Sequence, residues 1–361
     1  MNKEHFEGNV NWITSGELKE HYISDTKEKI SEDAATANNL KLLHPGTFVI
    51  AIYGLEADGV RGTGSITCKE STISQACMAF TQKGDVKNEF LYSWYKKHGN
   101  IIGIKYAQGT KQQNLSYEIL EKFHIAYPSQ DEQDKLIKFI SLLDERIATQ
   151  SKLIEDLKKL KSAIIDYAIN SLDTDFAKFG SLYEMAGEGG TPATSNASFY
   201  DNGKIPFIKI DDLKKKYLTE NKDFITELGL QKSSAWLVPS RSILFSNGAT
   251  IGKITITTYP VSTKQGILGI VPKPNINVEF LYYFMSSSYF KKAVSRIVTE
   301  GTMKTAYLKD INNIRCPIPI KEKQQDIAKM PSALNSKIDF EQSILKRFCS
   351  QKQYLLRQMF M

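Results

Sequence analysis

The sequence has few cysteines, few histidines and no long apolar run, and these shortages exclude several classes of protein. Its four cysteines are scattered and form no C-x-x-C pair, which argues against a disulfide framework and favours reduced thiols in a cytoplasmic protein. The longest apolar run, residues 46–54, has about half of the ~20 residues that a transmembrane helix needs. The first residues contain acids and no apolar segment typical of a signal peptide, so we expect no membrane association.

A recognisable catalytic signature is also missing. Residues 248–254 are similar to a phosphate-binding loop, but they contain one residue too few between the glycines, and Ile254 stands where Ser or Thr would hold magnesium. All five histidines precede residue 125 without a partner at metal-binding spacing, so we predict no metal site and no catalytic residue. We find no methyltransferase, helicase or nuclease motif. These absences favour binding over catalysis; a self-contained methyltransferase or nuclease is the enzymatic alternative.

The sequence does contain enough apolar residues for a core, and its positive charge is unevenly distributed along the chain. The length of 361 residues, 41% of them hydrophobic, predicts two or three domains. The formal net charge is +7, and the whole basic excess lies after residue 170. A localised surplus fits a polyanionic partner, because neutralising phosphates releases counterions. A mildly basic protein without such a partner is the alternative.

The chain is an imperfect duplication. Residues 10–18 align with residues 205–213, the sequence Glu-Phe-Leu-Tyr occurs at both 89–92 and 279–282, and residues 143–147 align with residues 334–338. The offset stays between 190 and 195, and the anchors keep their order. Internal repetition of this kind indicates two copies of one structural unit.

Each copy has a globular part and a helical part. Short β-branched and aromatic runs separated by Gly, Asn and Pro predict strands, and the Glu-Phe-Leu-Tyr segments predict short helices. We therefore predict an α+β (mixed α/β) protein with two duplicated globular domains at 1–128 and 173–319. Long helices are predicted at 129–172 and 320–361, paired within the chain as an antiparallel coiled coil.

Apolar residues at alternating spacings of four and three predict the packing stripe of these helices. The stripe consists of Leu143, Ile147, Ile154, Leu157 and Ile164 in the first helix, and Leu334, Ile338, Leu345, Phe348 and Leu355 in the second. Ser129 and Glu132 form a capping-box pattern that predicts the first helix start. Pro331 predicts a break or kink in the second helix, with a restart near Ser332.

With these features, nearly the whole chain resembles a specificity subunit of a type I restriction–modification system. The residues that carry the resemblance are 190–192, 205–208, 248–253, 264–266, 300–302 and 317–319, together with Pro128, Glu132, Gln133 and the Leu-Asp-x-x-Ile sequence at 143–147. The resemblance implies two target recognition domains that each read one half of a split DNA sequence. The helices would act as a spacer: residues 143–168 would span about 39 Å, close to the ~34 Å turn of B-DNA.

The resemblance also implies the partners. Two modification subunits would carry S-adenosylmethionine and methylate adenine, and restriction subunits would translocate and cleave double-stranded DNA using ATP and magnesium. The chain itself would hold no cofactor and catalyse nothing. The second copy opens with residues 178–195, which have no counterpart before Met1, so we expect a first recognition domain shortened at its N-terminus. A degenerate subunit that assembles without full sequence readout is therefore the alternative function.

Candidate DNA-binding residues are polar side chains in or beside turns that follow predicted strands, because these residue types read bases or hold phosphates. In the second domain they are Lys209, Asp211, Asp212, Lys214, Asn247, Lys253, Lys264, Gln265, Thr302 and Lys304. In the first domain they are Thr14, Ser15, Glu17, Arg61, Gln75, Thr110, Lys111 and Gln112. Each of them is also compatible with an ordinary solvated loop residue.

Overall fold

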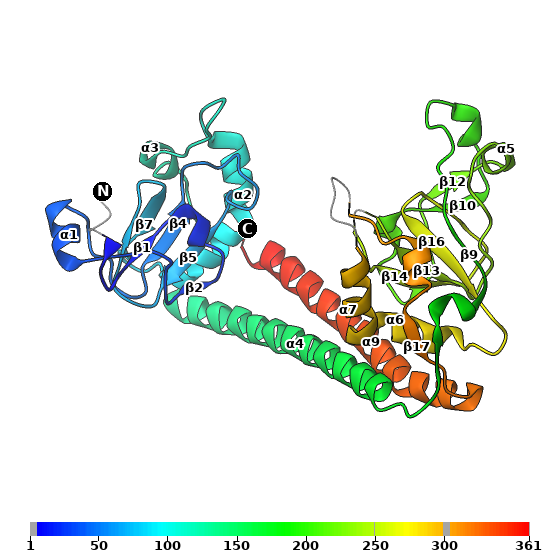
Figure 1. Cartoon of the computed structure of the whole chain (residues 1–361). Coiled ribbons are helices and arrows are strands. Elements are labelled where there is room, and N and C mark those ends of the chain that lie inside the picture. Colours follow the sequence, from blue (N-terminus) through cyan, green and yellow to red (C-terminus); the bar gives the residue numbers. More distant parts are fainter. Residues whose placement is uncertain (1–5, 249, 299–303, 361) are drawn as a thin grey trace. The chain divides into compact units, whose positions relative to one another are not determined.

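The computed structural model describes residues 6–248, 250–298 and 304–360, and the chain divides into two compact units. Unit 1 consists of Met1–Gln150 and Ile344–Met361, and unit 2 consists of Ser151–Ser343. Two long helices, α4 (Gln130–Asn170) and α9 (Lys321–Met359), are shared between the units, so each unit contains one part of each helix (Figure 1).

The globular part of unit 1 contains two small sheets and a helix, α2, that packs on one of them. Its elements are β1 (Val10–Ile13), η2 (Ser15–Glu17), β2 (Tyr22–Ile23), β3 (Lys29–Ile30), α1 (Glu32–Ala37), β4 (Phe48–Ala51), β5 (Gly64–Thr67), β6 (Ser71–Ile73), β7 (Cys77–Phe80), α2 (Asn88–Tyr106) and α3 (Tyr117–Leu120).

The globular part of unit 2 repeats this plan with additions at its beginning and end. Its elements are β8 (Phe176–Lys178), η3 (Phe179–Ser181), β9 (Tyr183–Glu188), η4 (Ala197–Phe199), β10 (Ile205–Ile208), η5 (Ile210–Asp212), β11 (Tyr217–Leu218), β12 (Asp223–Ile225), α5 (Glu227–Gln231), β13 (Ile243–Ser246), β14 (Ile254–Thr257), β15 (Ser262–Thr263), β16 (Ile267–Pro272), α6 (Val278–Ser286), α7 (Ser288–Ile297), α8 (Leu308–Ile311) and β17 (Arg315–Pro317).

The two units share one sheet topology. The strand orders β3-β1-β6 and β2-β5-β4-β7 in unit 1 recur as β12-β10-β15 and β11-β14-β13-β16 in unit 2. β1 pairs parallel with β6, and β10 pairs parallel with β15. The duplication and the mixed α/β class predicted from the sequence are thereby confirmed. Unit 2 adds β9, which pairs antiparallel with β16.

Each globular part has its own apolar core between the larger sheet and the helix that follows it. In unit 1, Phe48 and Ile50 of β4 are buried together with Phe90 of α2. In unit 2, Phe245 of β13 is buried with Phe280 of α6. The helices predicted at the Glu-Phe-Leu-Tyr segments are present as α2 and α6, but α2, with 19 residues, is longer than the predicted short helix. Burial of such side chains stabilises by roughly 1.5–3 kcal/mol each.

The long helices pack together antiparallel within each unit. In unit 1, Lys352 of α9 forms an ion pair with Asp144 of α4, and Arg146 lies 4.8 Å from the ring centre of Phe348. In unit 2, Lys161 Nζ donates a hydrogen bond to Asn335 Oδ1 at 3.0 Å. Lys161 and Lys352 thus each have a polar partner on the other helix.

The predicted stripe lies on the less exposed side of both helices. Ile154 and Ile338 are buried, and the half-buried members are Leu143, Ile147, Leu157, Ile164, Leu334, Leu345, Phe348 and Leu355. The predicted capping box at the start of α4 is also present. The Ser129 N–H donates to Glu132 Oε2 at 3.3 Å, and the Glu132 N–H donates to Ser129 Oγ at 3.4 Å.

The predicted break at Pro331, with a restart near Ser332, is wrong, whereas the alternative of a kink there stays a prediction. α9 runs from Lys321 to Met359 with Pro331 inside it. A proline removes one helical hydrogen bond and costs roughly 3 kcal/mol, but here Pro331 is buried and Ser332 is held by the globular part of unit 2. Tyr283 Oη lies 3.1 Å from Ser332 Oγ, and Ser332 Oγ donates to Glu279 at 2.7 Å. Tertiary contacts therefore keep the helix continuous.

Candidate nucleic-acid interface

The predicted residues of unit 2 gather where two parallel strands end. Phe207 of β10 lies opposite Ser262 of β15, so the carboxyl ends of the two strands coincide. The turns that follow carry Lys209 and Lys264, and the Lys264 N–H donates to the Ile208 carbonyl at 2.9 Å. Lys209, Asp211, Lys214, Lys264 and Gln265 are all exposed at this end. Segments more than 50 residues apart in sequence thus meet on one surface.

The turn after β10 has a fixed backbone. Asp212 Oδ2 accepts a hydrogen bond from the Lys209 N–H at 2.8 Å, and Glu17 Oε2 accepts one from the Thr14 N–H at 3.0 Å in the equivalent turn of unit 1. Asp212 and Glu17 therefore shape these turns. Lys209 Nζ also pairs with an Asp223 carboxylate oxygen at 2.8 Å.

Lys253 Nζ lies 3.4 Å from Asp211 Oδ1. The Asp211 side chain is almost fully exposed, and those of Lys209 and Asp223 are about half exposed. Exposed ion pairs contribute about 0–1 kcal/mol, so exchanging these carboxylates for DNA phosphates costs little.

Asn247 differs from the prediction, because its side chain is buried. The Asn247 N–H donates to the Gly266 carbonyl at 3.0 Å, and Asn247 Nδ2 donates to the Ala306 carbonyl at 3.3 Å. Asn247 therefore holds the Lys264–Gly266 turn and the segment after Lys304 against β13, and it is removed from the candidate DNA-contacting residues. Lys304 itself is exposed, and Thr302 lies outside the described residues.

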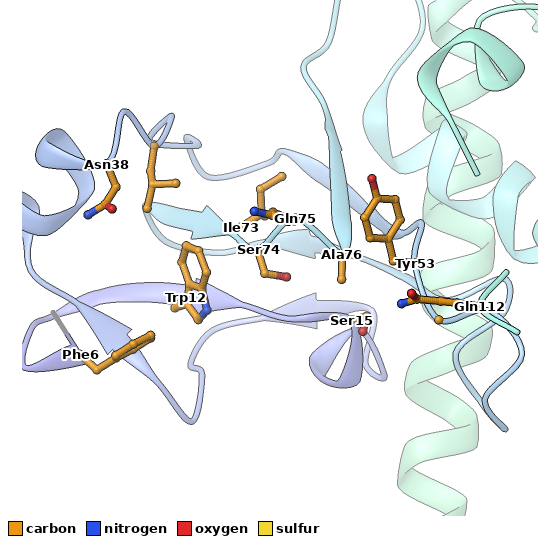
Figure 2. A pocket seen from close by; sticks show the side chains of 12 residues that line it. Phe6, Trp12, Ser15, Asn38, Tyr53, Ile73, Ser74, Gln75, Ala76 and Gln112 are labelled. Carbon is orange, nitrogen blue, oxygen red and sulfur yellow. The ribbon is translucent and has the colours of Figure 1, made fainter. Parts of the chain in front are cut away.

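In unit 1 the equivalent residues surround a hollow of about 920 Å³. β1 and β6 end together, and the Ser74 N–H donates to the Ile13 carbonyl at 2.9 Å. Ser15 and Gln75 lie in the two turns, and Gln112 reaches the same hollow from the loop after α2 (Figure 2).

Trp12 and Tyr53 also line this hollow. Sequence reasoning missed these two aromatic residues as site residues, although the aromatic position within the aligned strand at 10–18 was a usable signal. Aromatic faces can stack on bases or pack on sugars.

The remaining candidates of unit 1 lie in or near the loop at residues 108–114. The Gln108 N–H donates to the Asn114 carbonyl, and the Leu55 N–H donates to the Gln113 carbonyl, which anchors this loop beside the end of β4. Thr110 and Lys111 are exposed on it. Arg61 is engaged inside the unit, because its Nη2 donates to Gln113 Oε1 at 2.7 Å.

Two buried glutamines fix the start of each long helix to its globular part. In unit 1, Gln133 Oε1 accepts from the Lys87 N–H at 2.9 Å, while its Nε2 donates to the carbonyls of Asp85 and Pro128 at 2.9 Å each.

In unit 2, Gln324 makes the same three bonds, to the Asn277 N–H at 2.8 Å and to the carbonyls of Pro319 and Asn275 at 2.8 and 3.3 Å. Both side chains are almost fully enclosed. The repeat thus preserves the connection between the globular part and the long helix.

A second repeated contact ties the Glu-Phe-Leu-Tyr helix to the strand beside it. Glu279 Oε2 pairs with buried Lys216 Nζ at 2.7 Å, and Glu89 Oε2 lies 2.8 Å from His21 Nε2 in unit 1. Burial alone would raise the pKa of Glu279, but hydrogen bonds from Lys216, Tyr217 and Ser332 outweigh it and lower the pKa below its ordinary value.

Within residues 6–248, 250–298 and 304–360, no three His, Cys, Asp or Glu side chains come together as a metal site. Nor does any helix in this part of the chain have the length and apolarity needed to cross a bilayer. The turns described above carry polar and basic side chains, which is an arrangement suited to binding a polyanion.

Comparison with known families identifies the class of this binding protein. The family described as "Type I restriction modification DNA specificity domain" matches residues 1–159 and 173–347. The chain therefore belongs to the specificity subunits of type I restriction–modification systems. Such a subunit determines which DNA target is recognised and is the non-catalytic component of its complex. It carries no cofactor of its own, and S-adenosylmethionine and ATP bind the modification and restriction subunits.

Two relatives agree with this membership. The MjaIX specificity subunit of Methanocaldococcus jannaschii is 25% identical over 350 residues, which cover 89% of this chain and 79% of the relative. The EcoR124I/EcoR124II specificity subunit of Escherichia coli is 25% identical over 256 residues, covering 67% of this chain and 62% of the relative.

Two solved structures share the fold. The specificity subunit from M. genitalium has a TM-score of 0.58 at 18% identity and covers 100% of this chain and 91% of that one. A chain from a study of the assembly and conformational transition of a type I system has a TM-score of 0.65 at 14% identity and covers 97% and 90%. The likeness confirms the fold of two sheet-rich domains with two long helices packed together.

Proposed function

We propose that each unit reads one half of a split DNA target, through the turns after β1 and β6 in unit 1 and after β10 and β15 in unit 2. The observation that carries this proposal is the gathering of polar side chains at the carboxyl ends of equivalent parallel strands in both repeats. The side chains differ between the copies, so the two half-sites differ and the target is asymmetric.

The two surfaces present different kinds of side chain to DNA. Unit 2 presents exposed lysines, including Lys209, Lys214 and Lys264, which suit phosphate contacts. Unit 1 presents Gln75 and Gln112, whose amides can pair with adenine in the major groove. Each lysine–phosphate contact adds about 0.9 to the slope of log affinity against log salt. Substitutions in unit 2 therefore reduce the salt dependence more than substitutions in unit 1.

Two modification subunits dock on the spacer helices at 129–172 and 320–361, which follow the recognition domains at 1–128 and 173–319 in the sequence. In unit 2, Leu153, Leu160 and Tyr167 of α4 are exposed by 41, 48 and 76% and recur every seven residues, a spacing that fits an apolar stripe on a partner helix. The modification subunits methylate adenine, and restriction subunits join them to translocate and cleave DNA in the cytoplasm.

The test is selection of DNA from a random pool by the reconstituted complex of this chain with its modification subunits. The double variant Lys264→Ala, Gln265→Ala in unit 2 should relax one half of the selected motif and leave the other intact. The variant Gln75→Ala in unit 1 should do the reverse. Lys159→Ala, an exposed change on α4, is the matched control and should leave the motif unchanged. Loss of both halves, or of neither, would contradict the division of reading between the units.

The alternative is a scaffold that assembles without complete reading. It is favoured by one observation: unit 1 has no strand equivalent to β9 among its described residues. A motif with only one defined half, despite normal capture of modification subunits, would support this alternative.

A further inference from the structure

The polar turn between β10 and β11 in unit 2 is followed directly by a buried lysine. This turn, residues 209–215, carries the exposed residues Lys209, Asp211 and Lys214, and we call it the reading turn. Lys216 is the next residue, and its side chain is only 2% exposed. Lysine is almost never fully buried unless its charge is paired, so the surroundings of this side chain indicate what it does.

The backbone of Lys216 is fixed to the larger sheet of unit 2. The Ile256 N–H donates to the Lys216 carbonyl at 2.7 Å, and Thr255 Oγ1 donates to the same carbonyl at 3.3 Å. Both donors belong to β14. The end of the reading turn is therefore held in place, and the Lys216 side chain leaves it from a fixed point.

The ammonium group of Lys216 contacts two helices. Lys216 Nζ lies 2.7 Å from Glu279 Oε2 of α6 and donates to Ser332 Oγ of α9 at 2.8 Å. The ring centres of Tyr217 and Tyr283 each lie 4.8 Å from the same nitrogen. Because aromatic faces attract cations, the two rings stabilise the charge in the position that the carboxylate and the hydroxyl define.

The hydrogen bonds around Lys216 form a closed network. The Ser332 hydroxyl accepts from Lys216 and Tyr283 and donates to Glu279, which uses its one donor and both acceptor sites. The other carboxylate oxygen of Glu279 accepts from Tyr217 Oη. A buried network whose members are all paired favours a single arrangement of the elements that it joins. Here those elements are the end of the reading turn, α6 and α9.

The repeat contains a similar arrangement in unit 1. His21 directly precedes β2, as Lys216 directly precedes β11. The ring centre of His21 lies 4.1 Å from that of Tyr22 and 4.0 Å from that of Tyr92, and its Nε2 lies 2.8 Å from Glu89 Oε2. Both copies thus place a basic side chain between two tyrosine rings and against a glutamate at the end of the equivalent turn.

We infer that Lys216 is a positioning residue for target recognition: it fixes the end of the reading turn to α6 and α9, so that the turn meets DNA in one orientation. The inference rests on the proposed function, in which this turn contacts DNA. Phosphate contacts do not depend on sequence, whereas contacts to base edges do and need defined geometry. Lys216 therefore acts on the preference for the target and not on affinity for DNA in general.

The test is the double variant Lys216→Met, Glu279→Gln in the complex of the full chain with its modification subunits. Removing both charges avoids the unpaired carboxylate that Lys216→Met alone would leave, and methionine packs well against aromatic rings. We expect unfolding of unit 2 at nearly the wild-type urea concentration. The ratio of affinities for the selected target and for random DNA should fall about tenfold, the worth of roughly one base contact. Affinity for random DNA should stay unchanged.

A second measurement uses no DNA. The amides of Leu213 and Lys214 donate hydrogen bonds within the reading turn, and their hydrogen exchange should accelerate in the double variant while that of β13 stays unchanged. The matched control is Lys329→Met, Asp326→Asn, which removes an ion pair from α9 whose side chains are 75 and 61% exposed. This control should alter neither the exchange nor the affinity ratio.

Three results would overturn the inference. The first is a wild-type affinity ratio in the double variant, and the second is unchanged exchange in the reading turn. The third is a parallel loss of affinity for target and random DNA, which would show a general structural role. If the wild-type complex selects no half-site through unit 2, the proposed function fails instead, and the exchange measurement still decides whether Lys216 fixes the turn.

Discussion

Replacing Gln324 by alanine should separate two contributions to the stability of unit 2. One comes from the buried hydrogen bonds that tie α9 to the globular part, and the other from the helix packing around them. The side chain is 1% exposed and makes three hydrogen bonds to backbone groups on either side of this connection. Truncation leaves the Asn277 N–H and the carbonyl of buried Pro319 without partners, while Asn275 is an exposed residue, so that water can replace the bond to its carbonyl. An unsatisfied buried group costs about 1–3 kcal/mol. For the two groups together, the expected loss is therefore about 2–6 kcal/mol in the unfolding free energy of unit 2.

The loss can be measured by urea unfolding followed through Trp236, the single tryptophan of unit 2. Exchange of the Asn277 amide hydrogen should accelerate in parallel. Lys329→Ala is the matched control on the same part of α9, because Lys329 Nζ makes an exposed ion pair with Asp326 at 2.7 Å, and an exposed change should stay within ~0.5 kcal/mol. A loss for Gln324→Ala no larger than that of the control would refute the reasoning.

Three further predictions follow from single contacts. Because the pKa of Glu279 is lowered in the folded state, its ion pair stabilises above the ordinary glutamate pKa and is lost as the pH falls through the lowered value. The unfolding free energy of unit 2 should thus fall on acidification below about pH 4.5, and less so in Glu279→Gln. Ile338→Ala removes a side chain that is 4% exposed and should cost about 2–5 kcal/mol. Leu160→Ala, at a 48% exposed position, should change stability by less than ~1 kcal/mol but weaken capture of modification subunits by about tenfold.

For each of these three predictions, one experimental result would contradict it. An identical acid response of wild type and Glu279→Gln would show that the ion pair does not govern the pH dependence. A loss below ~1 kcal/mol for Ile338→Ala in denaturant unfolding would show that the helix pair is loosely packed. Unchanged capture of modification subunits by Leu160→Ala in a pull-down titration would exclude this row of α4 as the docking surface.

The duplication, the strands and the two helices could be predicted because they depend on local pattern. Apolar side chains alternate with polar ones at residues 254–257 and are clustered at residues 267–271. The structure has strands β14 and β16 at these positions. Ser129 and Glu132 lie within one turn, so their capping bonds needed no knowledge of the rest of the chain.

The failures have a common physical cause, which is contact between segments far apart in sequence. Pro331 forms part of a continuous helix because Ser332 is held by Tyr283 and Glu279, about 50 residues earlier. By sequence, Asn247 is an ordinary turn residue. In the fold its side chain is buried and donates a hydrogen bond to the Ala306 carbonyl. Gln133 was recognisable as part of a motif, but its role depends on Asp85, which only folding brings near.

The central claim is that both units of this specificity subunit select the DNA target. Its most direct test is a base-resolution methylation map of cells that express the chain with its modification subunit, compared with cells that lack the chain. The account predicts new methyladenine in a split, asymmetric motif with two defined halves. No chain-dependent methylation, despite confirmed assembly with the modification subunit, would contradict it.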